Sequence, residues 1–537
     1  MSCERMQRSR TVARGPSARA PDSDFESPRI RHPLTGPDPA SPACRAPATF
    51  PGMAAATLPG LSPDICERAL DARDARFDGI FFVGITTTRI YCRPVCPARV
   101  SYHDRRRFFD SAASAERAGF RPCLRCRPEL APGRALIDAV PNLARVAAHR
   151  IAAGALNGRG VARLADDLGV SDRHLRRVLE RELGVSPLEL AQTHRLLLAK
   201  RLLADTSLPV TRIAYASGFQ SLRRFNSVFR ERYRLSPTRL RGDPRRGGGP
   251  APPAPPGDLI RLTLAYREPL DWAALGRLLG RGVMPGVEVV EAERYGRTVG
   301  LDGRSGIVLV ERHAEAARAY LVVHVSASLL PALMPLLARL RQLFDLDAEP
   351  RVVDAHLERG GLGPLVRRRP GLRVPGALDG FEAALRVLLH GAAAAAARRV
   401  VRTLGEPIET GVPGLDRLAP EAERVARSDA AELTRLGVPR HRAEAIVAVA
   451  RAVAAGTLWL EPGSDVAATH RGLRAIDGVD ARLATAILTH AVHWPDAFPA
   501  SDRALQRAAG AASARGLLAR AEAWRPWRAY AAAHLRL

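Results

Sequence analysis

Lysine is almost absent from this 537-residue sequence, which has one, Lys200, among 81 basic residues. Aromatic residues make up only 5% of the chain. No apolar run approaches the ~20 residues of a membrane-spanning helix, and no charged, apolar and cleavage-site pattern opens the sequence. Its seven cysteines, four of them closely paired, suit a reducing compartment better than a disulfide framework. These absences predict a cytoplasmic protein without a membrane partner.

Arginine dominates what is present. The formal net charge is +26 and the pI is near 11, so polyanions such as nucleic acid are the expected partners. A merely arginine-rich solvated surface is the alternative for any single charged run. The length predicts several domains with enough apolar material for their cores.

Two cysteine pairs, Cys92 with Cys96 and Cys123 with Cys126, are separated by 26 residues. Each pair can present two sulfurs to one ion, so the spacing predicts a tetrahedral Zn²⁺ site with four thiolates. Two roles are open. The ion can simply hold a small domain together, which is the commoner case for four-cysteine sites, or an exposed zinc thiolate can attack an alkyl electrophile.

The residues around these cysteines bear on that choice. The stretches Ile90-Tyr-Cys-Arg-Pro-Val-Cys-Pro-Ala-Arg and Ala118-Gly-Phe-Arg-Pro-Cys-Leu-Arg-Cys-Arg-Pro resemble the amino-terminal domain of the Ada-type adaptive-response proteins. The resemblance implies that Cys92 accepts a methyl group from a DNA methylphosphotriester and stays on zinc as a thioether. It also implies that Cys96, Cys123 and Cys126 are companion ligands.

Residues 1–55 are rich in Pro, Arg, Ser and Ala with little apolar periodicity, which predicts disorder. More ordinary sequence begins at Met53, which is a second candidate translation start. A helix is expected from Cys66 to Arg76, with Cys66 as a buried packing residue.

Residues 135–241 are expected to be wholly helical and internally repeated. The segments beginning at Val161 and Val210 each run through a short amphipathic helix to a glycine, Gly169 or Gly218, suited to a tight turn. A second helix rich in basic residues follows each glycine. The region holds 19 basic and nine acidic residues, which favours a nucleic-acid-binding face.

Two such units, leading to Ser186-Pro187 and Ser236-Pro237, resemble the AraC-type regulator module. This predicts binding to promoter DNA, with RNA polymerase as a further partner. The expected DNA contacts lie at the start of each second helix: Arg173, Arg176, Arg177, Arg223 and Arg224.

Residues 242–257 are rich in Pro and Gly and predict a linker. Strands are expected at Leu259–Tyr266, Gly306–Val310 and Ala319–Val325, with helices at Trp272–Arg281 and Leu329–Phe344. Alanine- and leucine-rich helices dominate from Arg351 onward.

This second half resembles the AlkA-type 3-methyladenine DNA glycosylases, on segments such as Arg341-Gln-Leu-Phe-Asp-Leu-Asp, Pro370-Gly-Leu-Arg-Val-Pro-Gly and Asp496-Ala-Phe-Pro-Ala-Ser-Asp-Arg. The resemblance places Asp502 at the catalytic aspartate and Gly478 in the DNA-binding hairpin. A carboxylate can stabilise the oxocarbenium-like sugar that forms when a glycosidic bond breaks. A helix cap is the alternative role for Asp502.

Several positions depart from that family. Asp480 stands where the hairpin of the family usually has glycine. His390-Gly391-Ala392 replaces the residues that usually fill the gap left by the flipped base. The family's aromatic pocket residues are replaced here by Arg482, Ala486 and Arg536. With Lys200 the only lysine, a strand-cutting Schiff base is not expected, which predicts a monofunctional glycosylase. No Pro-Cys-His-Arg motif occurs, so repair of O6-alkylguanine is not expected.

The sequence therefore predicts a multidomain α and α+β protein for DNA alkylation repair and response. The alternatives are a non-enzymatic zinc-containing regulator with a vestigial glycosylase domain, and a glycosylase that the front half only delivers to DNA. The expected domains are a zinc α/β domain (56–132), an all-α tandem helix-turn-helix (135–241), a small α/β domain (258–350) and an all-α helix-hairpin-helix domain (351–537).

Overall fold

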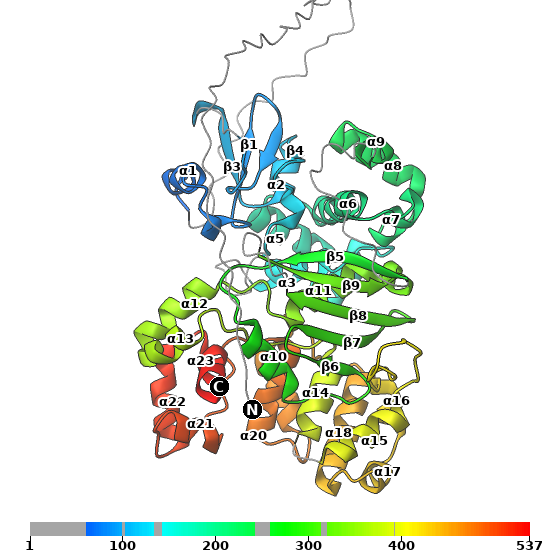
Figure 1. Cartoon of the computed structure of the whole chain (residues 1–537), viewed down its shortest axis with the longest axis vertical. Helices are drawn as coiled ribbons and strands as arrows, with labels where there is room; N and C mark the ends of the chain where they lie inside the picture. Colours follow the sequence, from blue (N-terminus) through cyan, green and yellow to red (C-terminus); the bar gives the residue numbers. More distant parts are fainter. Residues whose placement is uncertain (1–60, 99–102, 134–141, 242–257, 313–318, 391–392) are drawn as a thin grey trace, which may run out of the picture. The chain divides into compact units, whose positions relative to one another are not determined.

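The computed structural model describes residues 61–98, 103–133, 142–241, 258–312, 319–390 and 393–537 (Figure 1). The expected disordered extension and the Pro/Gly linker lie outside these residues. No helix of the described segments is long and apolar enough to cross a membrane.

The first sheet has four short strands in the order β3-β1-β2-β4. Its aromatic core is small and includes Phe82, Tyr91, Phe109 and Phe120. A core of this size is small for a domain of about 70 residues, and a bound metal ion would add to its stability. The elements are α1 (Pro63–Asp71), β1 (Phe82–Ile85), β2 (Ile90–Cys92), β3 (Arg106–Phe109), α2 (Ala112–Arg117) and β4 (Arg121–Pro122).

The helix expected from Cys66 to Arg76 is shorter than predicted. Helix α1 ends at Asp71, because Arg73 has a left-handed backbone with φ 48° and Asp74 then caps a separate 3-10 turn. Cys66 itself is fully buried against Phe81, which confirms its packing role, and burial raises the pKa of its thiol to about 11.

The described residues from 142 to 241 are helical, as expected. In each unit a glycine with positive φ, Gly169 or Gly218, turns the chain from the first helix into the second. Helix α6 joins the units and buries side chains on all sides, while Ser186 and Glu189 form its capping box. The helices are α3 (Asn142–Ala152), α4 (Val161–Asp167), α5 (Asp172–Leu183), α6 (Pro187–Asp205), α7 (Val210–Ala216), α8 (Leu222–Tyr233) and α9 (Pro237–Arg241).

A second, antiparallel sheet has the order β5-β9-β8-β7-β6 and is drawn in green in Figure 1. The three expected strands are present as β5, β8 and β9, and the helix expected at Trp272–Arg281 forms. The helix expected at Leu329–Phe344 begins only at Leu333, because residues 327–332 form a 3-10 helix. Sequence patterns missed β6 and β7. The elements are β5 (Leu259–Ala265), α10 (Trp272–Gly280), β6 (Glu288–Val290), β7 (Arg294–Leu301), β8 (Arg304–Arg312), β9 (Tyr320–Ser326) and α11 (Leu333–Leu343).

The remaining chain is helical. Buried residues of α14, α18 and α20 share one hydrophobic cluster, and residues of α12, α13, α21, α22 and α23 share another. The helices are α12 (Pro350–Leu357), α13 (Gly363–Arg368), α14 (Gly380–Leu389), α15 (Ala394–Leu404), α16 (Ala422–Arg427), α17 (Ala430–Arg435), α18 (Arg440–Ala454), α19 (Val466–Arg474), α20 (Ala481–Ile487), α21 (Arg503–Ala508), α22 (Ala514–Ala521) and α23 (Arg528–Arg536).

Candidate metal centre and DNA-facing sites

The two cysteine pairs meet because β2 and β4 run parallel, with Tyr91 opposite Pro122. Cys92 and Cys123 therefore leave neighbouring strands at the same end, and each chain then turns back to supply a second sulfur. All four sulfurs lie within 4.8 Å of one another. A tetrahedral zinc ion with Zn–S bonds of about 2.3 Å needs sulfurs about 3.8 Å apart, so this cluster fits Zn²⁺.

The four sulfurs differ in their surroundings. Cys96, Cys123 and Cys126 are buried, whereas Cys92 is partly exposed. Backbone N–H groups of Arg93 and Arg125 donate to Cys126 Sγ at 3.4 Å and Cys123 Sγ at 3.3 Å, which favours the thiolate forms of these sulfurs. Cys92 is therefore the ligand most open to an electrophile.

Two arginines beside the cluster are already bound to carboxylates. Arg93 Nε donates to Asp78 Oδ1 at 2.8 Å, and Arg127 Nη1 lies 2.6 Å from Asp205 Oδ1 on α6. The first ion pair lies within the zinc domain, and the second joins that domain to α6. Arg89 lies over the Phe120 ring, with its guanidinium carbon 5.6 Å from the centroid.

The zinc domain contacts the helix-turn-helix module through buried polar groups. Lys200 Nζ on α6 donates to Cys123 O at 3.2 Å and forms an ion pair with Glu129. Glu116 on α2 accepts from Thr193 Oγ1 at 2.8 Å and from Tyr91 Oη at 3.1 Å. The sole lysine of the chain is thus a structural residue of this interface.

The helices α5 and α8 present most of the predicted DNA contacts to solvent. Arg173, Arg177, Arg223 and Arg224 are exposed. Arg176 instead forms an ion pair along its own helix, with Nε 2.7 Å from Asp172 Oδ1. Ser171 and Ser221 cap the two helices, which fixes where these basic faces begin.

Asp502 has the helix-cap role that the sequence offered as the alternative, and its other carboxylate oxygen forms an ion pair. Its Oδ1 accepts from the backbone N–H groups of Ala504 at 2.8 Å and Leu505 at 3.3 Å, which caps α21. Its Oδ2 lies 2.9 Å from Arg536 Nη2. Burial raises the pKa of this carboxyl, but Arg536 and the two N–H groups outweigh it, so the net pKa lies below its ordinary value. Asp502 is therefore ionised at neutral pH.

The hairpin between α19 and α20 contains Gly478 with φ 83°, where a Cβ atom would lie 2.7 Å from His441 O. Glycine is therefore required there. Asp480 Oδ1 accepts from Leu483 N at 2.8 Å, as the N-cap of α20. Burial lowers the pKa of Arg442 on α18, and the positive charge of Arg482 on α20 lowers it further. Two residues of the altered segment His390-Gly391-Ala392, Gly391 and Ala392, lie outside the described residues.

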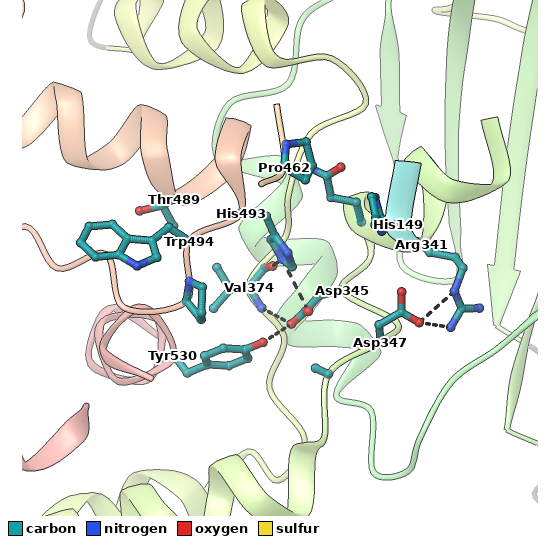
Figure 2. A pocket seen from close by; sticks show the side chains of 13 residues that line it. His149, Arg341, Asp345, Asp347, Val374, Pro462, Thr489, His493, Trp494 and Tyr530 are labelled. Atoms are coloured by element: carbon teal, nitrogen blue, oxygen red, sulfur yellow. Dashed lines mark hydrogen bonds and ion pairs between the residues drawn. The ribbon is translucent and has the colours of Figure 1, made fainter. Parts of the chain in front are cut away.

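A separate cavity has a volume of about 60 Å³, and Asp502 does not line it. Its lining side chains are drawn in Figure 2. Asp345 lies beside this cavity and accepts from Tyr530 Oη at 2.8 Å and Val374 N at 3.2 Å, with His493 Nε2 at 3.5 Å. Burial raises the pKa of Asp345. This cluster is a packed polar junction and not the site predicted from the sequence.

Sequence reasoning missed the contact between Arg536 and Asp502. No local pattern marks this pair, because its members lie 34 residues apart.

Three family models match the chain: the metal binding domain of Ada at residues 65–129, a helix-turn-helix domain at 164–243 and the AlkA N-terminal domain at 261–379. The first match and the gathered sulfurs confirm the predicted zinc ion. The matches occur in the order expected from the sequence.

Three relatives define the class further. A probable bifunctional transcriptional activator/DNA repair enzyme AlkA of Mycobacterium tuberculosis is 35% identical over 480 residues, which cover 88% of this chain and 95% of that protein. DNA-3-methyladenine glycosylase 2 of Escherichia coli is 30% identical over 278 residues, 51% of this chain and 95% of its own length. The bifunctional transcriptional activator/DNA repair enzyme Ada of Escherichia coli is 34% identical over 117 residues, 22% of this chain and 31% of its own.

A metal-binding domain, a helix-turn-helix module and a glycosylase-type half on one chain are the parts of a protein that joins DNA repair to transcription control. The chain belongs to the family of bifunctional transcriptional activator/DNA repair AlkA proteins.

Proposed function

We propose that this protein takes methyl groups from DNA methylphosphotriesters, regulates transcription from promoter DNA and excises damaged bases. Cys92 is the methyl acceptor, since it alone among the four gathered cysteines is not buried. Cys96, Cys123 and Cys126 complete the ligand set. A zinc ion bound there keeps the sulfurs as thiolates and therefore nucleophilic.

In the transfer, Cys92 Sγ attacks the methyl carbon of the triester. The new S–C bond forms as the methyl C–O bond breaks, and the phosphodiester leaves with the electron pair. The product is S-methylcysteine and an ordinary DNA phosphate, so each molecule reacts once. Intact-protein mass spectrometry after incubation with methylated DNA should show one added methyl group, located on Cys92 by peptide analysis and absent from Cys92→Ser. No methyl gain would instead support a purely structural zinc ion.

The helix-turn-helix module, residues 135–241, binds double-stranded DNA through exposed Arg173, Arg177, Arg223 and Arg224. Arg176 reaches DNA by exchanging its partner Asp172. RNA polymerase is the expected partner of this module at a promoter, and the cytoplasm is the expected compartment.

The half that spans residues 258–537 is a monofunctional DNA glycosylase, in which Asp502 stabilises the sugar cation and Gly478 belongs to the DNA-binding hairpin. The carboxylate is ionised and one fifth exposed, as this role requires. Asp502→Asn keeps the helix cap but loses the charge. It should therefore abolish release of bases from alkylated DNA while DNA binding persists. If the wild type releases no base, the second half is vestigial and the chain acts only as a regulator.

A further inference from the structure

The register of the first sheet places two of the gathered cysteines side by side. Strands β2 and β4 run parallel, with Tyr91 opposite Pro122, and Cys123 N–H donates to Tyr91 O at 2.9 Å. Cys92 and Cys123 are the next residues along the two chains, and neighbouring strands lie about 4.8 Å apart. A disulfide needs Cα atoms about 4.4–6.8 Å apart. These two cysteines therefore meet the backbone requirement of a disulfide without movement of the sheet.

One sulfur of the cluster is open to a reagent in solution. Cys92 is partly exposed, whereas Cys96, Cys123 and Cys126 are buried. A zinc-bound thiolate is an electron-rich sulfur that attacks soft electrophiles, and a peroxide oxygen is one of them. Since all four sulfurs lie within 4.8 Å of one another, a second thiolate is close enough to react with an oxidised Cys92.

The contacts of the three buried cysteines favour Cys123 as that second thiolate. Arg93 N–H donates to Cys126 Sγ at 3.4 Å and Arg93 Nη1 donates to Cys126 O at 3.2 Å, so two hydrogen bonds hold Cys126 in place. Cys96 lies beyond a turn that its own N–H closes on Arg93 O at 3.1 Å. The N–H that Cys123 Sγ accepts comes from Arg125 in its own loop, at 3.3 Å. Of the three, Cys123 is the one in register with the exposed cysteine.

We propose that Cys92 and Cys123 form a peroxide-sensitive disulfide site. Cys92 Sγ attacks one oxygen of hydrogen peroxide; the S–O bond forms as the O–O bond breaks, and hydroxide leaves. Cys123 Sγ then attacks the sulfur of the resulting sulfenic acid; the S–S bond forms as the S–O bond breaks, and a second hydroxide leaves. Each thiolate has lost one electron, and the peroxide has gained both.

This disulfide leaves Cys96 and Cys126 as the remaining thiolates, and two ligands are too few to retain Zn²⁺ in a four-cysteine site. Oxidation therefore releases zinc from the domain. A methylated Cys92 is a thioether and offers no thiolate to peroxide, so methylation protects the site. The inference goes beyond the proposed methyl transfer and does not depend on it.

The test treats the full-length zinc protein with hydrogen peroxide at neutral pH without a reductant. A coloured chelator follows the release of zinc, and mass spectrometry of unreduced peptides locates the disulfide. The wild type should release one zinc ion for each disulfide that joins Cys92 to Cys123. A thiol reductant with added Zn²⁺ should reverse both changes.

Three variants test the separate roles. Cys92→Ser should release zinc at least about tenfold more slowly than the wild type under peroxide, because no exposed thiolate remains. In Cys123→Ser the sulfenic acid on Cys92 loses its partner and should be trapped by dimedone. Cys66→Ser, which replaces a fully buried thiol outside the cluster, should behave as the wild type.

A zinc-releasing disulfide between any other two cysteines would overturn the inference, as would zinc retained while free cysteine in the same solution is fully oxidised. Peptide analysis of the wild type decides this even where a variant does not fold. Methyl uptake from methylated DNA is measured on the same preparation. Disulfide formation without methyl uptake would remove the proposed methyl transfer alone, and methyl uptake without this disulfide would remove the inference alone.

Discussion

The ion pair between Lys200 and Glu129 should control how firmly the zinc domain is held. Both side chains are almost fully buried, at 3% and 2% exposure, and Lys200 also donates to the backbone of the zinc ligand Cys123. Lys200→Met keeps the length of the side chain but removes its charge. Glu129 would then be a buried carboxylate with only Arg127 Nε, 3.0 Å from its Oε1, as a charged partner.

Breaking a buried pair on one side costs about 3–5 kcal/mol, and the remaining Arg127 places this case near 3 kcal/mol. That free energy corresponds to a roughly hundredfold increase in the fraction of molecules in which the zinc domain is open. Adding Glu129→Gln to Lys200→Met removes the unpaired charge and should restore most of the lost stability of the zinc domain.

The assay is the rate at which zinc passes from the full-length protein to a coloured chelator, which reports the front of the chain. Burial raises the pKa of Glu129, but Lys200 and Arg127 outweigh it and hold the net pKa below its ordinary value. The stability from this pair is therefore present above pH ~4.3 and lost as pH falls through the folded-state pKa.

Lys200→Met should accordingly release zinc about a hundredfold faster than the wild type at pH 7, with the double variant close to the wild type. Equal rates for the single and double variants would show that the charge pair does not hold the domain. Faster release from the double variant than from Lys200→Met would refute the reasoning outright.

Three further predictions concern other parts of the chain. Burial raises the pKa of Asp354 to about 6, so its contribution to stability is full below pH ~3.9 and lost as pH rises through 6. Asp354→Asn keeps an oxygen that can accept from Gly371 N–H. The variant should therefore unfold at a higher temperature than the wild type at pH 8 but not at pH 4, as measured by tryptophan fluorescence. Borohydride should trap no covalent DNA adduct on residues 258–537, because no lysine lies there, and an adduct on that half would refute the monofunctional assignment. Arg223→Ala and Arg224→Ala together should weaken promoter binding and reduce its salt dependence, by about one power of salt concentration for each DNA phosphate that these arginines no longer neutralise; an unchanged salt slope would remove both from the phosphate interface.

Local patterns account for what could be predicted from the sequence. The two ligands of each cysteine pair are close together in the sequence, so their spacing was enough to predict the zinc site. Gly169 and Gly218 could likewise be assigned to turns, because the positive φ of such a turn is a local property that favours glycine. Local patterns could not predict which elements far apart in the sequence pack against one another.

Strand β7 shows why part of the fold was missed. It carries Arg297 at a buried position, where an alternating apolar pattern would need a hydrophobic residue. Arg297 Nη2 lies 2.7 Å from Glu382 Oε2 on α14, and only the folded chain brings these two residues together. The contact of Arg536 with Asp502 escaped for the same reason.

We expect methylation of Cys92 to change how tightly this protein binds promoter DNA. A zinc ion with four thiolates has a formal charge of −2, and one methyl group leaves it near −1, which reduces repulsion from DNA phosphate by ~1–3 kcal/mol. Promoter affinity should be measured at fixed salt before and after exposure to methylated DNA, for the wild type and Cys92→Ser. Binding about ten- to a hundredfold tighter is expected for the methylated wild type only. Equal affinities for the methylated and unmethylated wild type would contradict this expectation.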